Sequence, residues 1–249
     1  MKTTLTLTTL CTTLLFSFAL PTFAQDTTVQ AVPAKSSQHD AVKPVPRDKG
    51  WMNRHESMNA RVAKGNVDLI FIGDSITQGW EGAGKEVWKE FYGKRNAVNL
   101  GISGDRTQHV IWRLDNGNLE GIAPKLAVIM IGTNNSNSNK PQEIADGIKV
   151  ILEQLESKTP DTKVLLLGIF PRGATPEVPQ RIVNRETNEL IAEFADGERV
   201  HYLDISDKFL EDDGTLSKEI MPDLLHLNQK SYRIWAESIE PKVAELLAD

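Results

Sequence analysis

The sequence predicts an α/β protein built on a doubly wound, flavodoxin-like parallel sheet of five strands, folded as a single domain. Two observations lead to this prediction. First, five short runs consist mostly of Val, Ile and Leu, as expected of parallel strands that helices cover on both faces. Second, helix-like stretches separate the runs, and such alternation is typical of a parallel sheet with crossover helices. The five runs are residues 67–72, 97–100, 126–131, 164–170 and 200–205.

The helix-like stretches follow the runs in order. An entry helix precedes the first run, and a longer helix closes the chain. Pro241 lies inside that last helix, and we expect it to bend or split the helix because proline has no N–H to donate. The predicted helices are residues 51–62, 86–92, 107–114, 141–157, 180–195 and 228–247.

The first 50 residues do not have the pattern of a folded domain. Lys2 precedes a Thr- and Leu-rich stretch that ends at Ala24, so residues 1–24 are expected to be a signal peptide. Residues 25–50 are rich in Pro, Ser, Gln, Lys and Asp and are expected to form a flexible tether. Residues 51–249 then hold the globular domain.

Charge and composition restrict the classes of partner. The net charge is −6, and removal of the signal peptide with its single charge, Lys2, leaves −7. This acidic balance argues against nucleic acid and anionic membrane surfaces. The apolar part of residues 1–24 is too short for a comfortable membrane helix, and Cys11 within it is the single cysteine. We expect a secreted or periplasmic protein without a stable membrane anchor, a disulfide or a cysteine nucleophile.

Two segments far apart in the sequence supply the parts of a serine hydrolase. Ser75 follows the first apolar run, in Gly-Asp-Ser, and the sequence Asp-Leu-Leu-His ends at His226. A serine attacks an acyl carbon only when a histidine removes its proton and a third group orients that histidine. The spacing of Asp223 and His226 suits a single loop in which the carboxylate reaches Nδ1. The predicted triad is Ser75, His226 and Asp223.

Two further segments could stabilise the oxyanion of the tetrahedral intermediate. Gly104 follows the second apolar run and Asn134 follows the third. A glycine N–H can approach a substrate without a Cβ in the way, and an Asn amide is a common oxyanion donor. With the N–H of Ser75 they form a predicted three-donor oxyanion hole. All these residues follow carboxyl ends of strands, where open α/β sheets bind ligands.

Simpler roles compete with each of these assignments. Ser75 could cap a helix, His226 could bond to backbone, and Gly104 and Asn134 could be turn residues. A metal site at His226 would lack a third ligand at useful spacing. We therefore expect neither a metal nor a cofactor. We favour the hydrolase because, under the simpler roles, four separate segments would all have to match its chemistry by coincidence.

The acyl pocket is predicted from the neighbours of the catalytic residues. Ile76, Thr133 and Leu225 would form a small apolar cup that favours acetyl over longer acyl groups. Arg172 and Arg106 could each bind a hydroxyl, carboxylate or phosphate of the substrate, and each could instead pair with Asp105 or another acid. For Trp80, stacking on a sugar ring competes with packing in the core. The roles of the two arginines stay open on the sequence alone.

These motifs resemble the SGNH, or GDSL-type, hydrolase superfamily, which is named for the residues found here as Ser75, Gly104, Asn134 and His226. The segments 98–101, 104–114, 132–135, 171–173 and 224–227 are most similar to the alpha subunits of platelet-activating-factor acetylhydrolase and their bacterial relatives. The resemblance extends from about residue 67 to residue 247. Those alpha subunits are cytosolic whereas residues 1–24 look exported, so their physiological substrate does not carry over.

Taken together, the sequence predicts an exported serine esterase that hydrolyses short-chain, chiefly acetyl, esters. Acetylated carbohydrate, a polysaccharide or a sugar, is the leading substrate class for an exported acidic enzyme, and lipid esters are the alternative within the same enzyme class. A non-catalytic carbohydrate- or partner-binding protein on the same fold is the alternative of another class. The oligomeric state stays open, a homodimer included.

Overall fold

The computed structural model describes residues 1, 4 and 39–248, and residues 39–248 belong to one compact unit. Its centre is a parallel five-stranded sheet with strand order β2-β1-β3-β4-β5. This order is that of the flavodoxin-like doubly wound sheet, and it confirms the predicted α/β single-domain fold. The strands are β1 (Leu69–Gly73), β2 (Ala97–Gly101), β3 (Leu126–Met130), β4 (Lys163–Leu167) and β5 (Val200–Leu203).

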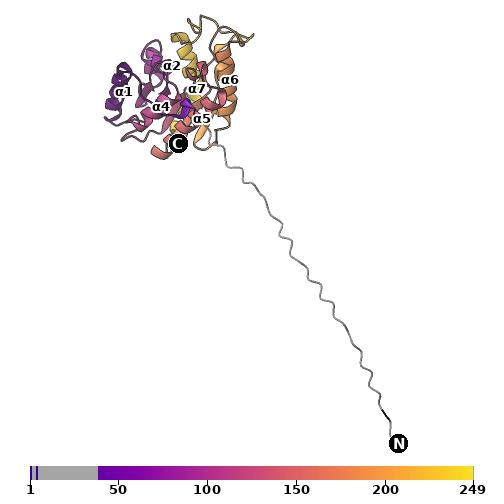
Figure 1. Ribbon diagram of the computed structural model, residues 1–249. Helices are drawn as coiled ribbons and strands as arrows, with labels where there is room; N and C mark the ends of the chain where they lie inside the picture. The colour runs from indigo at the N-terminus through magenta and orange to yellow at the C-terminus, as the bar shows by residue number, and fades with distance from the viewer. Residues whose placement is uncertain (2–3, 5–38, 249) are drawn as a thin grey trace. The chain divides into compact units, whose positions relative to one another are not determined.

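Helices connect the strands and can be followed along the chain in Figure 1. Each predicted helix is present, with ends that differ by up to three residues from the prediction. Short helical turns add to them beside the strands. The helices are α1 (Lys49–Val62), α2 (Ser75–Gln78), α3 (Lys85–Phe91), α4 (Thr107–Asp115), α5 (Pro141–Lys158), α6 (Pro179–Ala192) and α7 (Gln229–Ala248), with the 3-10 turns η1 (Asp40–Val42), η2 (Gly79–Glu81), η3 (Asn135–Asn137) and η4 (Ser206–Phe209).

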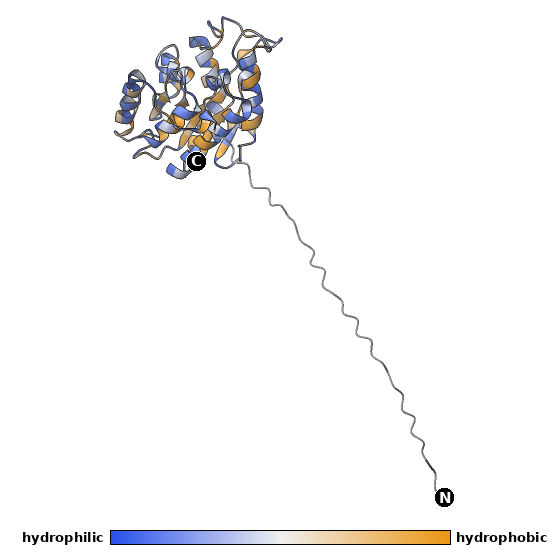
Figure 2. Cartoon of the chain, viewed as in Figure 1, coloured by the Kyte–Doolittle hydropathy of each residue, from blue (hydrophilic) through white to orange (hydrophobic). Residues whose placement is uncertain are grey.

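The sheet is covered on both faces, which explains why its strands are apolar throughout. Alternate residues of β1 enter different cores: Ile70 packs with α1, α4 and α5, whereas Phe71 packs with α3 and α7. Figure 2 shows hydrophobic residues concentrated on the strands and on the helix faces turned toward them. A sheet buried on both faces needs apolar side chains at every position, not at every second one.

The structure corrects the predicted tether at its carboxyl end. Residues 25–38 lie outside the described part, but residues 39–50 are folded against the domain. Ala41 is fully buried, its carbonyl accepts a hydrogen bond of 2.7 Å from Thr107 Oγ1, and η1 contacts both α4 and α5. The prediction was wrong here because it rested on the Pro and Lys content. The contacts that hold this segment, one buried alanine and its backbone carbonyl, cannot be recognised from composition.

Of the two expected effects of Pro241, a bend or a split of the last helix, the split is absent, since α7 runs through it from Gln229 to Ala248. Pro241 and Glu237, whose carbonyl loses its intrahelical partner, are both exposed, so water can satisfy that carbonyl. The predicted signal peptide lies outside the described residues apart from positions 1 and 4. Within the part of the chain that the structure describes, none of the helices has the length and apolar character needed to cross a bilayer.

Candidate active site

Ser75 stands at the first turn of α2, directly after β1. Asp74 precedes it as the N-cap, and its Oδ1 accepts the Ile76 N–H at 2.9 Å. Gly73 ends the strand where a Cβ would lie 2.1 Å from Thr77 Oγ1 and 2.5 Å from the carbonyl oxygen of Met130. The Gly-Asp-Ser sequence therefore makes a tight strand-to-helix turn that leaves Ser75 partly exposed at the carboxyl edge of the sheet.

His226 reaches Ser75 across 151 positions of sequence. The distance from Ser75 Oγ to His226 Nε2 is 2.9 Å, and His226 Nδ1 lies 2.7 Å from Asp223 Oδ2. Asp223 Oδ1 also accepts the N–H groups of Leu225 at 3.1 Å and of His226 at 2.7 Å. Burial opposes ionisation of Asp223, but these hydrogen bonds and the charge of His226 outweigh it and lower the pKa of the carboxyl.

The loop that carries the histidine contains a strained residue that the sequence did not reveal. Leu224 has φ of 62°, a left-handed conformation that costs a non-glycine residue about 1–3 kcal/mol. Its N–H donates to the Met221 carbonyl and its carbonyl accepts from the Gly173 N–H, both at 2.8 Å. These two bonds hold the turn that points Asp223 and His226 at each other.

Asn134 and Gly104, two of the predicted oxyanion donors, are connected by a hydrogen bond from Asn134 to Asp105, the residue that follows Gly104. Asn134 Nδ2 donates to the backbone carbonyl of Asp105 at 2.8 Å, and its contact with Asp74 Oδ2 is 3.4 Å. Gly104 adopts φ of 76°, which glycine reaches without strain. Asn134 thus touches the neighbour of Ser75 and the neighbour of Gly104, so three segments meet at one place.

A buried polar network holds the Gly104 turn. Asp105 is fully buried and accepts hydrogen bonds from Trp51 Nε1 at 2.6 Å and from Arg113 Nε at 2.8 Å. Arg113 is equally buried and also donates to Asn118 Oδ1 at 2.6 Å. Burial raises the pKa of Asp105, and Arg113 and Trp51 partly offset this effect.

This network was missed in the sequence, although a signal existed. Arg113 stands three residues after Val110, on the apolar face of α4, so its burial with a partner carboxylate could have been predicted. Arg47 could not have been predicted to take part. It reaches the turn from the segment before α1 and donates to the Ser103 carbonyl at 2.8 Å.

Arg172 and Arg106 lie near the same edge with different partners. Arg172 Nη1 donates to the Thr133 carbonyl at 3.0 Å, and the charges of Asp74 and Asp223 act on it. Burial lowers its pKa. Arg106 Nη1 donates to Ser138 Oγ at 3.1 Å. Arg172 thus interacts electrostatically with Asp74, which precedes Ser75, and with Asp223, the partner of His226.

Two predicted substrate contacts are corrected by burial. Trp80 is 1% exposed and packs against Tyr232 and Trp235, with ring centroids 4.6 and 4.9 Å away. No face of its ring is open to a sugar. Ile76 is also 1% exposed and belongs to the core between α3 and α7, because the residue after Ser75 turns inward at the start of α2.

Of the other two residues predicted to line the acyl pocket, only Leu225 is exposed enough to contact a substrate. Thr133 is 1% exposed, and its Oγ1 accepts a hydrogen bond of 3.3 Å from Asn184 Nδ2. Leu225 is the partly exposed member of the three. Around these residues, and elsewhere within 39–248, the described side chains form no cluster of three or more potential metal ligands.

A model of the GDSL-like lipase/acylhydrolase family matches residues 71–234, from β1 into α7, a range that includes Ser75, Asp223 and His226. The chain belongs to this family. As a GDSL-like acylhydrolase it is an ester-hydrolysing enzyme, and the resemblance read from the sequence motifs is confirmed.

The curated relatives of this GDSL-like acylhydrolase align over nearly their whole length. It is 38% identical over 214 residues to platelet-activating factor acetylhydrolase IB subunit alpha1 of Homo sapiens, covering 86% of this chain and 91% of that protein. Among solved structures, a GDSL-like lipase from Bacteroides thetaiotaomicron matches with a TM-score of 0.60 at 20% identity, over 78% of this chain and 97% of the other. Est24, a carbohydrate acetylesterase from Sinorhizobium meliloti, matches with a TM-score of 0.56 at 21% identity, over 72% and 99%. These two structures support the fold alone.

Proposed function

We propose that this enzyme hydrolyses acetyl and other short-chain esters with Ser75 as nucleophile, His226 as general base and Asp223 as the group that orients the base. The observation that carries the proposal is the 2.9 Å distance from Ser75 Oγ to His226 Nε2, with Asp223 2.7 Å from the other ring nitrogen. A helix cap or a loop histidine needs no such alignment. Nucleophile, base and orienting carboxylate in mutual hydrogen-bonding reach are typical of acyl transfer.

The chemistry proceeds in two displacement steps. Ser75 Oγ attacks the acyl carbon while its proton passes to His226 Nε2, and the same proton then goes to the alkoxide as the acyl–oxygen bond breaks. Water next attacks the acyl-enzyme and gives its proton to His226, and the proton returns to Ser75 as the carboxylic acid leaves. Asp223 holds a proton on Nδ1 throughout and stabilises the imidazolium.

The oxyanion formed in each step needs donors, and we propose the Ser75 N–H, the Gly104 N–H and the Asn134 amide. Asn134 Nδ2 already donates one hydrogen to the Asp105 carbonyl. Its second contact, to Asp74 at 3.4 Å, is long and weak, so an oxyanion can replace it. A donor of this kind contributes about 2.7–4 kcal/mol to the stabilisation of the transition state.

We propose acetylated carbohydrate as the leading substrate class and export as the setting, on the basis of the signal-like residues 1–24 and the acidic net charge of −6. A solved structure of similar fold is that of a carbohydrate acetylesterase. The lipid alternative is supported by the curated relatives, whose printed names specify platelet-activating factor acetylhydrolase. Both classes share the acetyl ester.

Turnover of p-nitrophenyl acetate tests the catalytic proposal. Ser75→Ala should lower kcat by at least about 10³-fold with an unchanged melting temperature, because only the nucleophile is lost. Ser57→Ala is the matched control, since Ser57 is exposed on α1, and it should keep full activity. Equal loss in both variants, or activity retained in Ser75→Ala, would remove Ser75 from the mechanism.

Acetate release from acetylated xylan and from an acetyl-glycerophospholipid separates the two substrate classes. A kcat/KM at least tenfold higher for xylan supports the carbohydrate proposal, and the opposite order supports the lipid alternative. Secretion is measured separately, by amino-terminal sequencing of protein from the medium or periplasm. A mature end at Gln25 is expected, and an intact Met1 in the cytoplasm would contradict export.

A further inference from the structure

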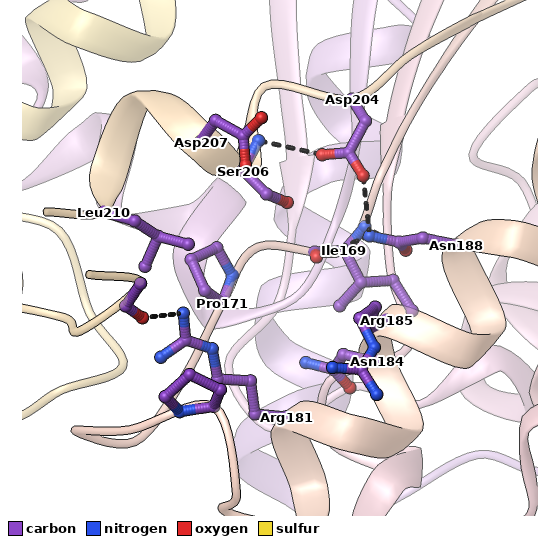
Figure 3. Close-up of a pocket in the computed structure, with 12 residues that line it drawn as sticks. Ile169, Pro171, Arg181, Asn184, Arg185, Asn188, Asp204, Ser206, Asp207 and Leu210 are labelled. Carbon is purple, nitrogen blue, oxygen red and sulfur yellow. Dashed lines mark hydrogen bonds between the residues drawn. The ribbon is translucent and has the colours of Figure 1, made fainter. Parts of the chain in front are cut away.

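A hollow of about 290 Å³ opens at the carboxyl edge of the sheet, beside the ends of β4 and β5. Its volume is just below the range of about 300–1,000 Å³ for ligand pockets, a size suited to one ring and not to a chain. Figure 3 shows Arg181, Asn184 and Arg185 of α6 along one side and Asp204, Ser206 and Asp207 along the other. Neither Ser75 nor His226 lines it.

Arg181 is the unusual residue of this hollow. It is 8% exposed, and its Nη2 donates to the Gly214 carbonyl at 2.6 Å, whereas its buried Nη1 has no partner among the described residues. No carboxylate of the described part lies within ion-pairing distance of the guanidinium. Burial lowers its pKa, an effect that the charge of Glu177 only partly offsets. A buried cation without a paired anion is costly, so an anionic ligand would stabilise this site.

Asn184 adds an unpaired acceptor next to this donor. Its Nδ2 donates to the Phe170 carbonyl at 3.2 Å and to Thr133 Oγ1 at 3.3 Å. The first of these bonds fixes the orientation of the amide, because a carbonyl accepts only from the NH2 end. Oδ1 is then left buried without a donor. A ligand hydroxyl would supply that donor.

The opposite side of the hollow offers further acceptors. Asp204 Oδ1 accepts the Ser206 N–H at 2.8 Å and Oδ2 accepts from Asn188 at 3.1 Å, which holds the carboxylate in place. Asp207 is exposed beside it. These carboxylates would repel an anionic group on their own side but accept hydrogen bonds from hydroxyls. The hollow thus has a cationic side at Arg181 and an acidic side at Asp204 and Asp207, so the two ends of a bound ligand would meet different charges.

We infer that this hollow binds a hydroxylated carboxylate of the size of one sugar ring, a uronate, with the carboxylate at Arg181 and hydroxyls toward Asn184 and Asp204. Pro171 and Leu210 supply apolar contact for the ring. The inference does not depend on the proposed esterase mechanism. Asn184 does connect the two places, because Thr133 accepts from Asn184 on one side and from Arg172 on the other.

Isothermal titration of the enzyme with D-glucuronate and with D-glucose tests the inference. Glucuronate should bind at least about tenfold more tightly than glucose, since a hydrogen bond between charged groups is stronger than one between neutral groups. Arg181→Gln should remove this preference. The matched control is Arg199→Gln, because Arg199 also has a buried Nη1 without a partner but lies at the opposite edge of the sheet, before β5.

A second variant keeps the test decisive if Arg181→Gln fails to fold. Arg185→Glu reverses an exposed charge on α6 at the hollow and should weaken glucuronate binding several-fold without changing glucose binding. Both variants should keep native turnover of p-nitrophenyl acetate, so a failure of the esterase proposal and a failure of this one give different results. Equal affinity for the two sugars in the native enzyme, or a glucuronate preference that survives the folded variants, overturns the inference.

Discussion

The carboxylate of Asp223 is fixed by hydrogen bonds from the backbone of its own loop, and these bonds determine the effect of replacing Asp223. One of its oxygens accepts the N–H groups of Leu225 and His226, and the other faces His226 Nδ1 at 2.7 Å. Its lowered pKa keeps the carboxylate ionised through the neutral range. The same side chain therefore shapes the turn and orients the imidazole.

Asp223→Asn separates these two tasks. The amide oxygen can still accept the backbone N–H groups, but the amide nitrogen would face Nδ1 and favour the wrong tautomer of His226. We expect kcat for p-nitrophenyl acetate to fall by about 10³–10⁴-fold with little change in melting temperature. Asp213→Asn is the control, because Asp213 likewise accepts backbone and side-chain bonds in an exposed turn. Retention of most of the activity in Asp223→Asn would contradict the orienting role.

Asp74 is a second carboxylate at the same turn, with the opposite electrostatics. It is fully buried beneath Ser75, and desolvation raises its pKa to about 7, with the nearby Asp105 carboxylate adding to the effect. The Ile76 N–H and the charge of His226 act the other way. Because the folded protein binds this proton more tightly than the unfolded chain, ionisation of Asp74 opposes folding.

The sign of the resulting pH dependence follows from that difference. Between about pH 4 and 7 the unfolded chain has lost the proton that folded Asp74 retains, so this residue's contribution to stability falls by up to about 1.4 kcal/mol per pH unit. Asp74→Asn should remove the fall, and the difference in unfolding free energy between variant and native protein should grow over that range in urea denaturation. A difference that stays constant would contradict the raised pKa.

Asp48→Asn provides a control of opposite sign. Asp48 caps α1, and its hydrogen bond from the Trp51 N–H lowers the pKa of the exposed carboxyl. Its contribution is present above the ordinary pKa of aspartate and is lost as the pH falls. The two variants should therefore change the pH profile in opposite directions.

The sequence allowed the proposed reacting residues to be predicted because Ser75 follows a strand end in Gly-Asp-Ser and because the spacing of Asp223 and His226 suits a single loop. It did not show which neighbours face the substrate. Ile76 and Trp80 follow Ser75 closely, yet both point into the core. Which face of a one-turn helix is buried depends on how α7 packs beneath it, as the Tyr232 hydroxyl bonded at 2.6 Å to the Ile76 carbonyl illustrates. Local sequence does not contain that information.

At the scale of elements, strands and helices were predictable because both faces of this sheet are covered. Continuous apolar runs then stand out between amphipathic stretches such as α5. The continuation of α7 through Pro241 could not be predicted, because the effect of a proline depends on whether the carbonyl four residues earlier is exposed, and that exposure depends on packing. The Arg113 ion pair shows the same limit: its position on α4 indicates burial, but its partner comes from the tertiary fold.

The ion pair between Arg113 and Asp105, with its hydrogen-bond partners, connects α1, α4 and β1 to the Gly104 turn. Arg113→Leu would leave Asp105 buried without its cation, and removal of one partner of a buried pair typically costs about 3–5 kcal/mol. We expect a loss of that size in urea denaturation, together with a lower kcat as the turn loosens. The double variant Arg113→Leu, Asp105→Asn should recover part of the stability, because it leaves no unpaired charge. A double variant no more stable than the single one would contradict this explanation.

At the scale of the whole molecule, the folded unit begins earlier than the apolar pattern indicates. Residues 39–47 add no strand or long helix, yet Ala41 is buried against α5 and Arg47 reaches the Gly104 turn, where its guanidinium lies about 3.0 Å from where a Cβ on Gly104 would stand. The segment before α1 therefore contributes both to the core and to the wall of the proposed oxyanion hole.

Two truncations test this contribution. A chain that starts at His39 should keep the melting temperature and kcat of the protein that lacks residues 1–24. A chain that starts at Asp48 keeps the cap of α1 but deprives Thr107 Oγ1 of the Ala41 carbonyl. Loss of a buried hydrogen-bond partner costs about 1–3 kcal/mol, and each kcal/mol shifts the melting temperature of a domain this size by about 2–4 °C.

Calorimetry and p-nitrophenyl acetate turnover distinguish the two roles of the segment. The chain that starts at Asp48 should melt several degrees lower and also turn over more slowly at 25 °C, where it is still folded, because Arg47 no longer holds the Ser103 carbonyl. Arg47→Ala in the longer chain should reproduce the slower turnover with a smaller change in melting temperature, since Ala41 stays in place. If both truncations melt and react alike, residues 39–47 contribute nothing to the domain, and the carboxyl part of the tether prediction was right.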